Sequence, residues 1–178
     1  MWIRFFLLLL ALTVCNAPAW ATPLLVGKQP TPVTLEGDLG GKVSGDPWRS
    51  DEIPKAGKVV SLFYIDPEER RSNEPLEEAY QIESLPKDKH LSFAIINMAA
   101  AWYPNSFISS ELRKKQVQFP QAIYVMDMKK TLVKEWGLKD DSVNLVIFGK
   151  DGNPLLIKHG PLSKEEIPSV MKLIRDNL

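Results

Sequence analysis

The sequence predicts an α/β domain with a mixed β-sheet and helices on both faces, and three observations support this prediction. Apolar runs typical of buried strands alternate with segments whose apolar residues recur at helical spacing. Two successive strand–helix–strand units indicate parallel strand pairs. The Asp151-Gly152 pair then separates two apolar runs, which predicts an antiparallel hairpin, and a helical stripe follows it to the end of the chain.

The predicted strands are short apolar runs that end at polar residues. Val59–Ile65 is nearly continuous in apolar residues and stops at Asp66-Pro67, as expected of a strand buried on both faces. The chain ahead of it is rich in Pro and Gly and is expected to form only short strands, such as one at 33–35. The remaining predicted strands cover 91–97, 122–126, 143–148 and 155–158.

The predicted helices lie between these strands. The first follows a polar stretch and has Pro75 in its first turn, where a missing N–H does no harm. The second covers 106–117, and a shorter one covers 131–136. On the second helix, the residues expected to face inward are Phe107, Ile108 and Leu112.

The last helix follows the hairpin. Ser163 and Glu166 have the spacing of a capping box, and apolar residues follow at helical spacing. Pro168 would remove a backbone hydrogen bond inside the helix, so we expect either a bend there or an opening turn with the helix starting at Pro168. The order strand, helix, strand, helix, strand, β-hairpin, helix is the thioredoxin-like arrangement.

The first 21 residues have the layout of a secretory signal peptide. Arg4 precedes an apolar run of about ten residues, which is too short for a bilayer core that needs about 20. Ala19 and Ala21 then form the small-x-small pattern of a cleavage site. We expect cleavage after Ala21, export and no membrane span.

This cleavage divides the chain into three predicted parts. Residues 1–21 form the cleaved signal peptide, 22–57 an irregular lead-in with short strands, and 58–178 the thioredoxin-like domain. A lipoprotein signal, with Cys15 lipidated, is an alternative, although Val14 stands where such signals have a small residue.

Composition excludes several functional classes. Lys and Arg number 22 and Asp and Glu number 22, so there is no electrostatic basis for binding nucleic acid. Cys15 is the only cysteine and lies in the predicted signal, which excludes thiol–disulfide chemistry in the mature chain. His90 and His159 lie in different segments and are expected to be solvated, so no metal site is predicted. Without a Gly-rich phosphate loop, no cofactor is predicted either.

Several motifs resemble those of exported thioredoxin-fold proteins. The resemblance covers a Gly-x-x-Pro lead-in at 26–30, the hairpin at 145–153 and the entry to the last helix at 160–166. Ser84-Leu85-Pro86, Ile95-Ile96-Asn97 and Trp136 further resemble the YtfJ family, small periplasmic proteins of Gram-negative bacteria. This resemblance spans nearly the whole mature chain. It implies a thioredoxin-like fold, a periplasmic location, and membership of a largely uncharacterised family without the active-site cysteines.

The candidate site lies where the strands end, because open α/β sheets bind ligands at the carboxyl ends of their strands. The loop at 66–73 occupies the place of the Cys-x-x-Cys motif of redox-active thioredoxins, and the segment at 142–144 occupies the place of their cis-proline. The aromatic loop at 98–104 follows the second strand, where a polar loop is usual. The candidate binding residues are Asp66, Glu68, Arg70, Arg71, Trp102, Tyr103, Ser142 and Asn144.

Two hypotheses from different classes follow from these residues. The main one is a non-redox binding module whose partner is a periplasmic protein or peptide, with Trp102 and Tyr103 in the recognition surface. The alternative that these two aromatics only cap the core stays open. The rival hypothesis is a cysteine-independent, hydrolase-like enzyme using the carboxylates of the loop from Asp66 to Ser72. Strongly perturbed pKa values in a deep cleft would favour the enzyme, and an aromatic-rimmed surface would favour binding.

Overall fold

The computed structural model describes residues 22–178, so the predicted signal peptide and Cys15 lie outside the described residues. A six-stranded mixed sheet runs through the centre in the order β2-β6-β5-β4-β7-β8. The strands β4, β5 and β6 are parallel, whereas β2, β7 and β8 are antiparallel to their neighbours. Their bounds are β2 Gly40–Lys42, β4 Val59–Ile65, β5 His90–Asn97, β6 Ala122–Asp127, β7 Val143–Phe148 and β8 Pro154–His159. The predicted mixed sheet is confirmed.

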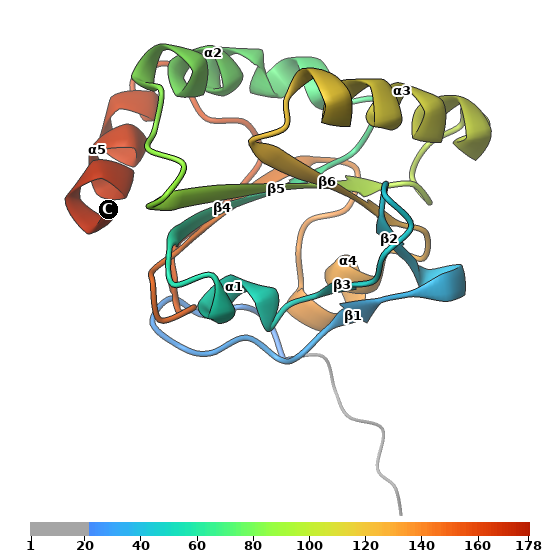
Figure 1. The fold of residues 1–178 in the computed structure, drawn as a ribbon, viewed down its shortest axis with the longest axis horizontal. Coiled ribbons are helices and arrows are strands. Elements are labelled where there is room, and N and C mark those ends of the chain that lie inside the picture. The colour runs from blue at the N-terminus through green and yellow to red at the C-terminus, as the bar shows by residue number, and fades with distance from the viewer. Residues whose placement is uncertain (1–21) are drawn as a thin grey trace, which may run out of the picture.

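Helices cover both faces of this sheet (Figure 1). One face carries α2 Glu74–Glu83, α3 Asn105–Gln118 and α5 Ile167–Asn177. The other carries α1 Glu52–Lys55, α4 Thr131–Trp136 and a small sheet of β1 Thr34–Leu35 and β3 Trp48–Arg49. Two 3₁₀ turns, η1 Gly37–Leu39 and η2 Arg70–Asn73, complete the elements.

Each central strand divides its side chains between two cores. In β4, Leu62 and Tyr64 face the core on the α1/α4 side, whereas Phe63 and Ile65 face the core on the α2/α3/α5 side. This two-residue period is what a strand buried on both faces requires, and the predicted burial of Val59–Ile65 is confirmed.

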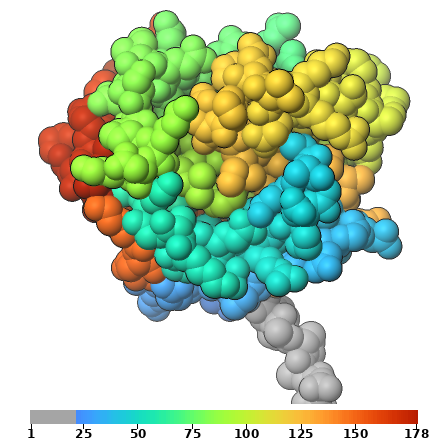
Figure 2. All heavy atoms as spheres, viewed as in Figure 1, coloured from blue at the N-terminus to red at the C-terminus, as the bar shows by residue number. Residues whose placement is uncertain are grey.

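The N-terminal lead-in also contributes to the core. Trp48 is fully buried and packs edge-on against Phe93 and Trp136, with ring centroids 5.8 and 6.2 Å apart. Residues 22–57 also supply β2 to the edge of the main sheet. In the space-filling view these residues, blue to teal, cover the lower part of the molecule (Figure 2).

The turn and cap signals are confirmed. Gly149 and Asn153 close the hairpin with an N–H···O=C bond of 2.9 Å, and Gly152 has a φ of 80°. The Ser163 N–H donates to Glu166 Oε2 at 2.8 Å and the Glu166 N–H donates to Ser163 Oγ at 3.3 Å, which is the reciprocal pattern of a capping box. The helix α5 begins at Ile167, so Pro168 lies in its first turn, where no hydrogen-bond donor is missed.

Candidate functional site

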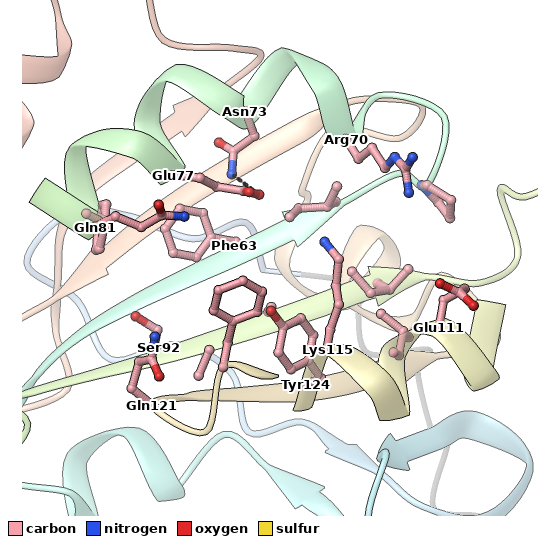
Figure 3. Close-up of a pocket in the computed structure, with 18 of the residues that line it drawn as sticks. Phe63, Arg70, Asn73, Glu77, Gln81, Ser92, Glu111, Lys115, Gln121 and Tyr124 are labelled. Atoms are coloured by element: carbon pink, nitrogen blue, oxygen red, sulfur yellow. Dashed lines mark hydrogen bonds between the residues drawn. The ribbon is translucent and has the colours of Figure 1, made fainter. Parts of the chain in front are cut away.

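An open groove lies between α2 and α3, and the sheet forms its floor. We call it the α2–α3 groove; its volume is about 1300 Å³. The walls include Glu77 and Gln81 from α2 and Glu111 and Lys115 from α3 (Figure 3). The floor includes Phe63, Ile65, Ala94, Ile96 and Tyr124.

The floor of the groove is not fully covered by helices. Phe63, Ile65, Ala94 and Ile96 keep 7–9% of their surface exposed, whereas Leu62, Phe93 and Ile95, which face the opposite core, are at 0%. The helix α2 also contacts α5 through the ion pair between Glu83 and Arg175. The floor of the groove keeps a small exposed area, whereas those three residues on the opposite face expose none.

Three exposed aromatic side chains line the groove, and we call them the aromatic rim. Trp102, Tyr103 and Phe107 are 73%, 46% and 59% exposed. The rings of Trp102 and Tyr103 are 4.3 Å apart between centroids, and those of Tyr103 and Phe107 are 6.3 Å apart. The alternative that Trp102 and Tyr103 cap the core is therefore wrong.

The predicted inward position of Phe107 is also wrong. Ile108 and Leu112, four residues apart, form the buried face of α3. Phe107 precedes Ile108 by one residue, which turns its side chain about 100° around the helix axis. That rotation points Phe107 towards the groove, where no described element covers it.

The eight predicted site residues fall into two groups. Those that line the α2–α3 groove are Glu68, Arg70, Arg71, Trp102 and Tyr103. The other three, Asp66, Ser142 and Asn144, are buried at the sheet edge and do not line it. The loop at 66–73 and the segment at 142–144 do meet as predicted, because the Asp66 N–H donates to the Ser142 carbonyl at 3.1 Å.

Both the oxygen and the nitrogen of the Asn144 side-chain amide form hydrogen bonds within the protein. Its Nδ2 donates to the Lys139 carbonyl and its Oδ1 accepts from the Lys139 N–H, both at 2.9 Å. The same Oδ1 lies 2.7 Å from His159 Nδ1. These bonds hold the turn at 139–144, so Asn144 shapes the sheet edge and is not available to a ligand.

A polar cluster that the sequence did not predict lies at the same edge. Lys130 Nζ is 2.6 Å from Asp140 Oδ2, and Asn97 Nδ2 donates to Asp140 Oδ1 at 2.9 Å. Burial alone would raise the pKa of Asp140, but the hydrogen bonds from Lys130 and Asn97 outweigh it and the pKa is lowered. Burial raises the pKa of Asp66, the buried carboxyl next to this cluster.

Three hydrogen-bonded polar side chains, Ser61, Tyr80 and His90, lie at the end of the groove where β5 begins. Ser61 Oγ is 2.7 Å from Tyr80 Oη and 2.8 Å from His90 Nε2. The expectation that His90 is solvated is therefore wrong: it is half-buried, and burial lowers its pKa to about 4. Ser61 is completely buried, so its hydroxyl cannot reach a substrate in the groove.

The pairing of β4 with β5 brings Ser61 close to His90, because Val59 of β4 lies opposite His90, and α2 supplies Tyr80. The one signal in the sequence is Ser61 itself, a polar residue within an apolar strand.

Across residues 22–178 there is no cluster of three or more His, Cys, Asp or Glu side chains suited to a metal ion. Nor does this part of the chain contain a helix long and apolar enough to cross a membrane.

Comparison with known proteins identifies the family. A family model described as "Bacterial protein of unknown function (YtfJ_HI0045)" matches residues 33–177. The chain belongs to this family. It is 30% identical over 132 residues to the uncharacterized protein YtfJ of Escherichia coli strain K12, covering 72% of this chain and 70% of that protein. An uncharacterized protein of Haemophilus influenzae is 23% identical over 129 residues, with the same coverage of 72% and 70%.

Solved structures similar to this YtfJ-family chain are thioredoxin-like. A putative thiol:disulfide interchange protein DsbE from Chlorobium tepidum matches with a TM-score of 0.61 at 16% identity, covering 86% of this chain and 98% of that one. The exposed lipoprotein thioredoxin Etrx1 of Streptococcus pneumoniae matches with a TM-score of 0.55 at 14% identity, covering 80% and 99%. At these identities the likeness shows the fold alone, and the predicted thioredoxin-like fold is confirmed.

Proposed function

We propose that the protein is an exported, non-redox binding module that holds a protein or peptide segment in the α2–α3 groove. The observation that carries the proposal is the aromatic rim beside an open groove with an apolar floor. Large exposed aromatic side chains are unfavourable in water, and their clustering is typical of interaction surfaces.

The size of the groove supports a macromolecular ligand. Pockets for small molecules usually enclose about 300–1,000 Å³. At about 1300 Å³ the α2–α3 groove exceeds that range and is open along one side of the sheet. A segment of polypeptide matches this size better than a metabolite does.

Export and the absence of redox chemistry are parts of the same proposal. The layout of residues 1–21 supports export to the periplasm, and Cys15 would leave with the cleaved signal. The loop at 66–72 contains no cysteine, although it follows β4 where redox-active thioredoxins have their Cys-x-x-Cys motif.

The hydrolase alternative receives less support from the carboxylates of this loop. Asp66 is buried and accepts a hydrogen bond from the Glu68 N–H at 2.9 Å. Glu69 accepts one from Ser72 Oγ at 3.0 Å within its own turn, and only Glu68 of the three lines the groove. These three residues therefore do not place a pair of carboxylates in one cleft, which is the arrangement that the hydrolase alternative would use.

A substitution that fills the groove tests the proposal. Ala94→Phe places a ring on the open floor, and it should abolish the capture of a partner from periplasmic extract by the immobilised protein. The matched control is Val117→Phe, which adds a ring to an exposed position of α3 outside the groove and should capture as the wild type does. Thermal melting of both variants checks their folding. A folded Ala94→Phe variant that captures the partner as well as the wild type does would show that the binding site lies outside the groove.

A further inference from the structure

We infer that the ligand of the α2–α3 groove is an acidic peptide segment, with apolar side chains on the floor and carboxylates facing Arg70, Arg71 and Lys115. This inference rests on the proposed function and specifies the chemistry of its ligand. The charges along the groove and the length of its floor lead to it.

The basic side chains of the groove lack acidic partners. The four that line it are Arg70, Arg71, Lys87 and Lys115. None of them belongs to an ion pair among residues 22–178, where eight other Lys and Arg side chains do. The groove therefore offers cations that a ligand could neutralise.

The acidic side chains of the groove are partly engaged already. Glu111 pairs with Lys114 at 2.6 Å, and Glu77 accepts the amide of Asn73 at 3.4 Å. Glu68 is the remaining carboxylate of the lining. The Asn73 amide carries no charge, so Glu77 keeps its negative charge beside Glu68. Four cations without an ion pair therefore face two carboxylates without one, and the groove favours a ligand of negative charge and repels one of positive charge.

The cations are distributed along the groove. Arg70 lies at one end, Ser92 and Gln121 lie at the other, and the Lys115 amine points from α3 into the space between the helices (Figure 3). An occupant that meets both Arg70 and Lys115 therefore contacts cations from two different elements, η2 and α3.

The length of the floor sets the length of the peptide segment that the groove can hold. His90, Ser92, Ala94 and Ile96 alternate along β5 and all line the groove, so it runs nearly the whole length of that strand. At about 3.3 Å per residue this is roughly 20 Å, enough for about six or seven residues of extended chain.

The walls favour a peptide over a lipid chain. Asn73, Gln81 and Gln121 line the groove with amide groups, and Ser92 of the floor adds a hydroxyl (Figure 3). Amides can exchange hydrogen bonds with a peptide backbone, whereas an acyl chain would bury them without partners. The mixture of apolar floor and polar walls therefore matches a peptide.

A set of three fluorescent heptapeptides tests the inference. All have Phe and Leu at the same alternate positions, and the remaining positions are all Glu, all Gln or all Lys. Fluorescence anisotropy with the purified exported protein should give the tightest binding for the Glu peptide, on the order of tenfold tighter than for the Lys peptide at low salt.

A charge-reversal variant identifies the side chains responsible. Arg70→Glu/Arg71→Glu should remove or invert the preference for the Glu peptide. The control Arg113→Glu/Lys134→Glu makes the same change in net charge at exposed positions outside the groove and should keep the preference.

The outcomes separate the inference from the proposed function. Equal binding of all three peptides by the wild type overturns the acidic assignment and leaves the binding module in place. Binding of none of them, with a fluorescent fatty acid bound instead, overturns the peptide assignment. A preference for Glu that survives in Arg70→Glu/Arg71→Glu overturns the role of these two arginines.

Discussion

Trp102→Ala should leave the melting temperature nearly unchanged and weaken partner binding by about 30-fold or more. Trp102 is 73% exposed, and substitutions at exposed sites usually change the free energy of unfolding by no more than about 0.5 kcal/mol. At a binding hot spot the same truncation removes about 2 kcal/mol of affinity, which corresponds to about 30-fold in Kd. Thermal melting and a binding isotherm for the captured partner measure the two effects separately.

Val117→Ala is the matched control for this substitution. Val117 is also an exposed apolar residue, at 83%, but it does not line the groove, so neither stability nor affinity should change. If Trp102 were a core residue, its truncation would destabilise the fold by about 3–5 kcal/mol and lower the melting temperature by about 6–20 °C. Such a drop, or an unchanged affinity, would contradict the role assigned to the aromatic rim.

Of all the substitutions proposed, Asp127→Ala should lower stability most, by about 3–5 kcal/mol, or about 6–20 °C in melting temperature. The carboxylate is completely buried at the end of β6. It accepts the N–H groups of Lys129, Thr131 and Leu132 at 2.9–3.1 Å and the Tyr64 hydroxyl at 3.2 Å. Its removal leaves the donors at the start of α4 without acceptors, and each buried donor so left costs about 1–3 kcal/mol.

Asp127→Asn is the control for this prediction. Asparagine keeps one oxygen acceptor at the same position, so it should retain part of the bonds and destabilise the protein less than alanine does. Thermal and urea unfolding of both variants give the comparison. An alanine variant as stable as the asparagine variant would show that the acceptor bonds to the start of α4 contribute little.

The regular elements of the fold could be predicted from the sequence, and so could the short strand β1 at Thr34–Leu35, but the strand β2 could not. Long apolar runs and the Asp-Gly turn each leave a pattern of several residues. The strand β2 has three residues and no period to detect. Gly40 in β2 is required because a Cβ there would lie 1.9 Å from the Met126 carbonyl oxygen of β6, a contact that exists only once the two strands are paired.

The candidate site could be predicted only in part, because its shape depends on contacts between elements that are far apart in the sequence. An apolar loop after a strand end identified Trp102 and Tyr103 directly from the sequence. The groove depends on the distance between α2 and α3, which no local pattern encodes. Helical spacing also assigned Phe107 to the core, because it cannot distinguish a buried face from a face that borders an open groove.

Site-specific photo-cross-linking tests most directly whether the groove is the binding surface. A benzoylphenylalanine side chain is introduced at Phe107, inside the groove, and in a second protein at Val117, on the outer side of the same helix. On irradiation with periplasmic extract, the variant at position 107 should form a defined adduct with the partner that Trp102→Ala abolishes, and the variant at position 117 should form none. Adducts from position 117 but not from 107 would show that the partner binds outside the groove.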